Sequence, residues 1–182
     1  MPELLAKPAI EAAPLTLAGL TLSVADPGPI TLIAPFPGQE KAVAKALKPL
    51  GLTFPGPNAA TTADDTLLVW TGRGQAALIG APVPQGLSSA AAVTDQTDGW
   101  VALSLTGPRA DQALMRLIPL DLRETALPTG SATRSGLNHM PMILIRRPEG
   151  FLIVTFRSMA RTAWHELEEV LRHLDARDLL PG

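Results

Sequence analysis

The chain contains neither cysteine nor tyrosine among its 182 residues. Without cysteine there is no disulfide framework, no thiol nucleophile and no thiolate metal site. Long apolar runs are also missing, because the longest extend over only several residues, far fewer than the roughly 20 needed to cross a bilayer. The opening segment, MPELLAKPAIEAAP, lacks the apolar centre of a signal peptide. We therefore expect a cytoplasmic protein with no membrane span.

Charge is scarce as well. Charged residues make up 18% of the chain, whereas about 25% is typical of globular proteins. Few solvated side chains are thus available to cover the surface, which favours a subunit with one face buried in a complex. The formal net charge is -2 and the pI is near 5.9, whereas proteins that bind nucleic acids concentrate Lys and Arg. Neither DNA nor RNA is an expected partner.

The length suits one compact subunit over residues 1–182, which we expect to be built from two small halves. The first half covers about 15–80 and the second about 91–182, and the segment GAPVPQGLSS at about 80–90 is the expected linker. Short strands alternate with few helices in both halves. The sequence therefore predicts an α+β fold with mainly antiparallel sheets. In the first half, a helix is expected over 39–50, with strands at 20–24, 30–36, 52–54, 66–70 and 75–79.

The second half carries the clearest local pattern. Residues 100–105 alternate as in a half-buried strand, with Val101, Leu103 and Leu105 on one face. Gly107 and Pro108 then lead into a helix whose apolar residues recur at helical spacing, and Pro108 suits a first helical position.

Three further elements complete this half. Strands are expected at 142–145 and 151–156, followed by a final helix over 159–175 with Ser158 as its N-cap. The expected core residues of this helix are Ala163, Trp164, Leu167, Val170, Leu171 and Leu174.

Two patterns resemble binding motifs but lack the required context. Residues 72–77 fit the dinucleotide fingerprint G-x-G-x-x-A, yet Gly80, Pro82 and Pro84 leave no room for the helix that would meet the pyrophosphate. A hairpin turn is expected there instead. His165 and His173 lie eight residues apart, not at the four-residue spacing that places two imidazoles on one metal. No nucleotide or metal site is predicted.

Other polar groups leave two interpretations open. Asp95 and Asp98 fit either a carboxylate pair for proton transfer or a turn before the strand, and the turn is the commoner use of Asp and Gly. Arg146, Arg147 and Arg157 fit an anion site, or else a solvated strand end or an ion pair between subunits, which are commoner uses of such residues.

Several segments together resemble the gamma subunit of heterotetrameric sarcosine oxidase. They are V-T-D-Q-T-D-G-W at 93–100, L-x-L-x-G-P-x-A-x-x-x-L-x-x-L at 103–117, Asp121-Leu122, His139-Met140-Pro141, and F-x-I-x-x-x-R-S-x-A at 151–160 followed by Trp164. The resemblance spans about half of the chain. It implies a fold like the folate-binding domain of aminomethyltransferase, the T protein of glycine cleavage.

The same resemblance implies that this chain has lost catalysis. Where the transferase family shows a glycine pair followed by adjacent aspartates, residues 137–147 read LNHMPMILIRR and offer no carboxylate. The implied role is a non-catalytic subunit that packs on the alpha, beta and delta subunits. FAD, FMN, NAD, tetrahydrofolate and zinc are implied on those partners, and none on this chain. The alternative is an autonomous folate-dependent one-carbon enzyme that uses Asp95, Asp98 or Asp121.

No catalytic, cofactor-binding or metal-binding residue is assigned. The family-like positions give the structural and contact residues that we expect: Trp100, Gly107, Pro108, His139, Pro141, Arg157, Ser158 and Trp164.

Overall fold

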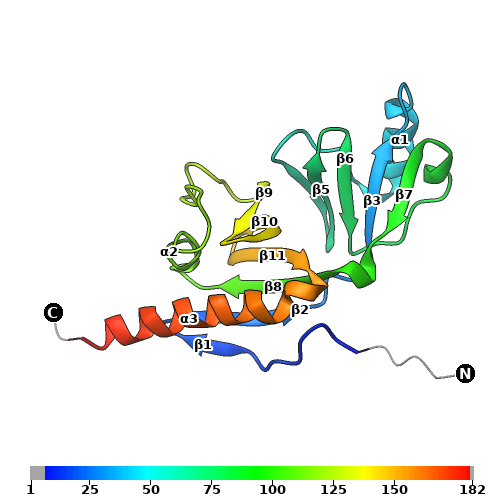
Figure 1. The fold of residues 1–182 in the computed structure, drawn as a ribbon. Coiled ribbons are helices and arrows are strands. Elements are labelled where there is room, and N and C mark those ends of the chain that lie inside the picture. The colour runs from blue at the N-terminus through cyan, green and yellow to red at the C-terminus, as the bar shows by residue number, and fades with distance from the viewer. Residues whose placement is uncertain (1–6, 181–182) are drawn as a thin grey trace, which may run out of the picture.

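Two antiparallel sheets form the frame of the protein, seen here in a computed structural model that describes residues 7–180 (Figure 1). The first sheet has the strand order β1-β2-β8-β11-β10-β9 and the second β4-β5-β6-β3-β7. The strands of the first sheet are β1 (Leu15–Leu17), β2 (Leu20–Ala25), β8 (Trp100–Thr106), β9 (Ala132–Leu137), β10 (Met140–Arg147) and β11 (Gly150–Phe156). Those of the second are β3 (Ile30–Pro35), β4 (Ala60–Ala63), β5 (Thr66–Gly72), β6 (Gln75–Ile79) and β7 (Ala91–Asp95). The predicted α+β fold with mainly antiparallel sheets is confirmed.

The helices cover the two outer faces of this frame. Helices α2 (Ala110–Leu114) and α3 (Ala160–Asp178) lie on the first sheet, whereas α1 (Glu40–Leu47) lies beside the second (Figure 1). Short 3-10 turns follow or precede several elements: η1 (Lys48–Leu50), η2 (Leu87–Ser89), η3 (Thr97–Gly99) and η4 (Arg157–Met159). Within residues 7–180, no helix is long and apolar enough to cross a membrane.

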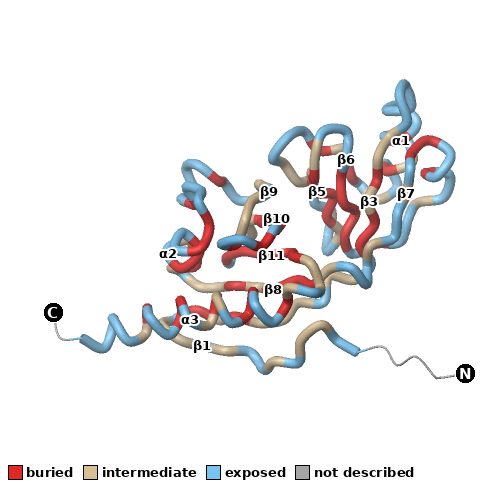
Figure 2. Tube along the Cα trace, viewed as in Figure 1, coloured by how far each residue is buried: buried red, intermediate tan, exposed pale blue. Residues whose placement is uncertain are grey.

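The buried apolar residues form three clusters that pack between these layers. Figure 2 shows the buried residues on the strands of both sheets and along α3. Leu103 and Leu105 of β8 face the cluster under α2 and α3, whereas Ala102 of the same strand faces the cluster between the sheets. A third cluster joins the outer face of the second sheet to α1 through Val43 and Leu47. The sequence predicted a strand buried on one face at 100–105, but the second sheet also covers its other face.

The two sheets do not correspond to the expected halves at about 15–80 and 91–182. Strands β1 and β2 belong to the first sheet, because β2 pairs with β8 in a register that places Leu22 opposite Leu105. Strand β7 belongs to the second sheet, where it pairs with β3. The segment at 80–90 includes η2 and buries Leu87 against α1 and its neighbours, so it does not separate the two sheets.

Four short strands, β1, β4, β7 and β9, were not predicted, and the strand expected at 52–54 does not form. The missed strands are brief or polar, as in the Ala-Thr-Thr-Ala sequence of β4, so their pairing partners define them rather than an alternating pattern.

Two predictions about helix starts were wrong. Ser158 lies in η4 and does not cap α3, whose N-cap is Met159 without a side-chain hydrogen bond. Pro108 precedes the N-cap Arg109 of α2 instead of occupying the first helical position. The predicted core stripe of the final helix is confirmed, because all six of its residues are buried.

Candidate functional site

Three hollows share lining residues near the turn that joins β10 to β11. Their volumes are about 410, 360 and 370 Å³, and Arg147 at the end of β10 lines all of them. The first lies between the end of β8 and this turn, and the other two reach toward Asp65 and Leu67 of the second sheet. We call the three together the Arg147 cleft and treat it as the candidate site.

Two glycines, Gly107 and Gly150, line the first hollow and bring the backbone close together there. The Gly107 N–H donates to the carbonyl of Glu149 over 3.0 Å. Gly107 has φ +123°, and a Cβ there would lie 2.5 Å from the Gly19 carbonyl oxygen. Gly150 has φ +152°, and its Cβ would overlap the carbonyl of Leu105. Only glycine fits at these two positions, because side chains are excluded by both backbone conformation and space.

Arg146 is engaged within the chain. Its Nε lies 2.6 Å from a carboxylate oxygen of Glu124, and its Nη1 donates to the Leu122 carbonyl over 2.5 Å. The guanidinium also stands 4.9 Å from the centre of the Phe151 ring, a cation–π distance. These contacts hold the loop that follows α2 against β10 and β11. The pKa of Glu124 is lowered, chiefly by the backbone N–H of Thr129 and to a smaller extent by Arg146.

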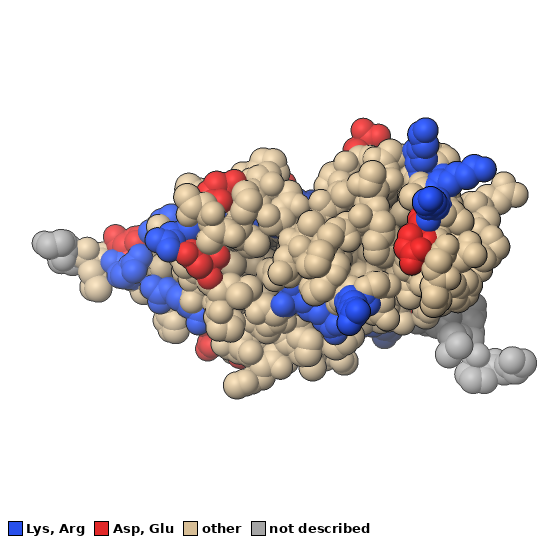
Figure 3. Space-filling view, turned by 90° about the horizontal axis from the view of Figure 1, so that it is seen from above, with Lys and Arg blue, Asp and Glu red and all other residues tan. Residues whose placement is uncertain are grey.

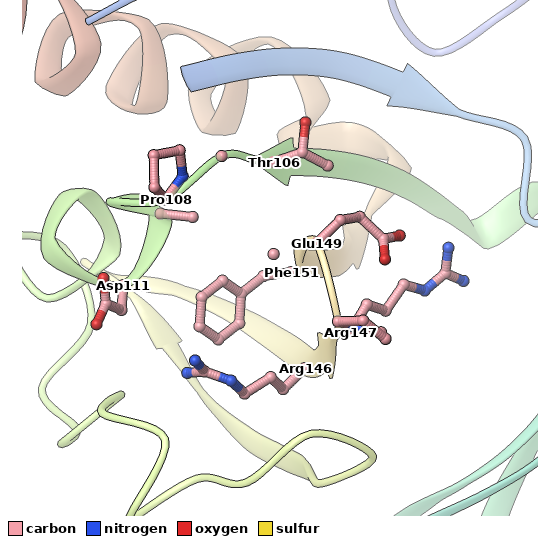
Figure 4. A pocket seen from close by; sticks show the side chains of 11 residues that line it. Thr106, Pro108, Asp111, Arg146, Arg147, Glu149 and Phe151 are labelled. Atoms are coloured by element: carbon pink, nitrogen blue, oxygen red, sulfur yellow. The ribbon is translucent and has the colours of Figure 1, made fainter. Parts of the chain in front are cut away.

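Arg147 differs from its neighbour. It is half-buried and forms no ion pair with any residue between 7 and 180. In Figure 4 its side chain and that of Glu149 project to one side of the turn, whereas Arg146 projects to the other. The hollows that it lines also contain Asp26, Asp65 and Glu149. A small free anion would therefore face one unpaired guanidinium and several carboxylates, which is a poor anion site.

The aspartates of the alternative hypothesis are engaged in local structure. Asp95 accepts hydrogen bonds from the N–H and hydroxyl of Thr97, which lower its pKa. The Asp121 carboxylate binds Arg123, whose side chain lowers the pKa of Asp121 to about 2. Asp98 lies in η3, as the turn interpretation predicts. None of the three lines any of the five hollows described for this chain. A carboxyl with a lowered pKa stays ionised near neutral pH and is a weak general acid.

The expected contact residues do not converge on one site. Gly107 and Pro108 line the first hollow. Trp100 lies at the opposite end of β8, where its ring centre is 4.7 Å from that of Phe156 and its Nε1 donates to Gln96 over 3.3 Å. These three residues thus lie at the two ends of one strand, β8.

The remaining members are spread over the turn between β9 and β10, strand β10, η4 and α3. His139 is exposed in the turn between β9 and β10, and the carbonyl of Pro141 accepts a 2.8 Å hydrogen bond from buried Thr155. Arg157 donates to the carbonyl of Lys7, and Ser158 is exposed beside it.

Trp164 is 9% exposed and lines a hollow of about 620 Å³ between α3 and residues 7–12. Packing and main-chain tethering are the contacts that the structure gives this group of residues.

The glycine-rich segment 72–77 forms a hairpin between β5 and β6, as predicted, and no helix begins there. Across residues 7–180, no group of three His, Asp or Glu side chains is arranged to hold a metal ion.

A second groove is not anticipated from the sequence. It has a volume of about 610 Å³ and lies between α1 with η1 and the segment Pro82–Gly86. Its signal in the sequence is a proline-rich segment combined with alanines and lysines on the preceding helix, a pattern that by itself indicates only a linker and a solvated face.

No protein-family model matches the chain, and no curated protein matches it. Among solved structures, it is similar to a chain of the heterotetrameric sarcosine oxidase from Corynebacterium sp. U-96, in complex with pyrrole 2-carboxylate. The two chains share a fold. The TM-score is 0.76 with 21% sequence identity, over 86% of this chain and 85% of the other.

The likeness to the sarcosine oxidase chain extends beyond the segments that suggested it. Those segments lie between residues 93 and 164, whereas the structural match includes most of the chain. Both sheets therefore belong to the common fold.

Proposed function

We propose that this chain is the gamma subunit of a heterotetrameric sarcosine oxidase and serves as a non-catalytic assembly subunit. The complex demethylates sarcosine oxidatively to glycine, with oxygen as electron acceptor and tetrahydrofolate as one-carbon acceptor, at sites on the partner subunits. The observation that carries the proposal is the extended match to a chain of such an oxidase, which covers 86% of one chain and 85% of the other.

The chemistry of the Arg147 cleft supports a structural role. Arg146 is held by Glu124, the Leu122 carbonyl and Phe151, so its guanidinium organises the turn. Arg147 is left to pair with a carboxylate of another subunit, which is a common use of arginine at interfaces. Every described carboxyl with a shifted pKa has it lowered by a hydrogen-bonding neighbour, and none is raised toward neutrality as a general acid requires.

The partners in this proposal are the alpha, beta and delta subunits, in the cytoplasm. FAD, FMN, NAD, tetrahydrofolate and zinc are assigned to them. This chain contains no cysteine and can supply no thiolate to the zinc site.

Co-expression with the large chains of a sarcosine oxidase from the same source tests the proposal. We expect a stable complex that consumes oxygen when sarcosine is added, and we expect the isolated chain to bind neither flavin nor folate in equilibrium dialysis. Stoichiometric folate binding by the isolated chain, or turnover without partners, contradicts the non-catalytic assignment. Failure of the chain to join the complex contradicts the proposal as a whole.

A further inference from the structure

The groove beside α1 combines small apolar residues with one-sided positive charge. Ala42, Ala46 and Pro49 line one side of it, and Pro82 and Val83 line the other. Val83 is 38% exposed, which is high for a large apolar side chain. Because alanine and proline side chains are short, the backbone of another molecule can approach closely here.

Lysines border this apolar surface. Lys41 and Lys45 are one helical turn apart on α1, each directly before an alanine of the groove, and Lys48 follows in η1. These are all the lysines of the chain except Lys7. All three are exposed, and none forms an ion pair with a residue between 7 and 180. Seen from above, basic side chains project from the end of the molecule where α1 lies, with acidic side chains beside them (Figure 3).

Helix stability explains only part of this arrangement. A cation is favourable in the last turn of a helix, where Lys45 lies, and unfavourable in the first turn, where Lys41 lies. Glu40, the acid nearest to these lysines in the chain, accepts a hydrogen bond from the Gly38 N–H instead. The positive charge is therefore available to a partner.

We infer that this groove binds an acidic amphipathic helix of a large subunit. An apolar stripe of that helix enters between α1 and the Pro82–Gly86 segment, in the manner of other helix-in-groove complexes. Carboxylates at positions i and i+4, beside the stripe, then face Lys41 and Lys45, because side chains four residues apart repeat along a helix at the same spacing on both partners. The inference rests on the proposed function, which supplies the large subunit.

Two pairs of variants test the inference in the purified complex. Lys41→Glu with Lys45→Glu reverses the charge at the rim, and Arg116→Glu with Arg177→Glu makes the same change in net charge at exposed positions outside the groove. Ala42→Trp fills the groove, whereas Ala44→Trp places the same side chain on an exposed position of the same helix that does not line it. We expect the lysine double variant and Ala42→Trp each to weaken binding to the large subunits about tenfold or more. The two controls should stay within about twofold.

Crosslinking identifies the occupant. Because the chain has no cysteine, Val83→Cys creates a single attachment point for a photoactivatable maleimide. Crosslinked peptides should come from a helix of a large subunit that carries Asp or Glu beside apolar residues.

Each other outcome contradicts the inference. The lysine double variant and Ala42→Trp could both bind the large subunits as tightly as the wild-type chain does. That result would refute the groove as a binding site and leave the proposed function intact. Crosslinks to a segment without acidic residues, or dimerisation of the isolated chain that Ala42→Trp abolishes, assign the groove to another occupant. If the wild-type chain does not assemble at all, the inference fails together with the proposed function.

Discussion

Replacing Gly107 by alanine should destabilise the protein far more than the loss of a typical surface glycine. Two effects add at this position. A non-glycine residue at φ +123° adopts a sparsely populated conformation, which costs about 1–3 kcal/mol. Its Cβ would also lie 2.5 Å from the Gly19 carbonyl oxygen and 2.9 Å from Leu20 Cδ2, and overpacking of this kind costs about 1–3 kcal/mol more. We expect a total loss of about 2–6 kcal/mol in the free energy of unfolding.

Gly130→Ala separates the two effects. Gly130 has φ +86°, and a Cβ added there would meet no atom within 4 Å, so only the conformational cost applies, about 1–2 kcal/mol. The difference between the two variants measures the crowding between β8 and the turn before β2. Urea unfolding followed by tryptophan fluorescence gives both values, and each kcal/mol corresponds to about 2–4 °C in Tm for a chain of this size.

A larger substitution at position 107 should also affect assembly. A β-branched residue such as valine should loosen the chain segment that leads into α2 and weaken the binding of this chain to the large subunits. Equal destabilisation by Gly107→Ala and Gly130→Ala would refute the steric argument, and normal assembly of Gly107→Val would refute the role of this position in the complex.

Three further predictions concern single side chains. Arg123 lowers the pKa of Asp121 from 3.8 to about 2. The stabilisation of the fold by ionised Asp121 is therefore complete above about pH 4 and is lost as the pH falls through about 2. The free energy of unfolding of Asp121→Asn should consequently depend less steeply on pH between these values than that of the wild type. The buried hydroxyl of Thr71 has no hydrogen-bond partner among the described residues, so Thr71→Val should raise the free energy of unfolding by about 1–2 kcal/mol, whereas Thr71→Ser, which keeps the hydroxyl, should not; a loss in the valine variant would show that the hydroxyl is bonded. Trp164→Ala should cost about 3–5 kcal/mol in urea unfolding, against a change within about 0.5 kcal/mol for exposed Thr162→Ala, and similar values for both would place Trp164 outside the core.

Patterns of burial in the sequence predicted the longer elements. The helical stripe of α3 and the hairpin at 72–77 depend on local periodicity and turn chemistry, and both form as predicted. Strand β7 shows the limit, because its Ala-Ala-Val-Thr-Asp sequence carries little alternation and it becomes a strand by pairing with β3. Ser158 shows a second limit of prediction from sequence. Its side chain is suited to capping a helix, but the 3-10 turn η4 places Ser158 before the N-cap position of α3.

The candidate sites were harder to predict than the fold. Arg146 and Arg147 are neighbours in the sequence and look equivalent there, yet only Arg146 meets Glu124, which comes from a loop more than twenty residues earlier. The groove beside α1 needs η1 and the Pro82–Gly86 segment to lie together, a contact between distant parts of the chain. Periodicity in the sequence describes only residues that are close together along the chain. It therefore cannot reveal contacts between distant segments, which depend on where the fold places each residue and not on its residue type.

Each sheet contains strands from both the N-terminal and the C-terminal part of the chain, so the protein cannot be divided into two independent halves. Scission between residues 80 and 90 would separate β2 on the N-terminal fragment from its neighbour β8. It would likewise separate β7 on the C-terminal fragment from its neighbour β3. Each piece would lack strands that pair within its sheet, so we expect it to be less stable alone than after recombination with the other. We therefore expect the two sheets to unfold together, so that a partner bound to either sheet stabilises both.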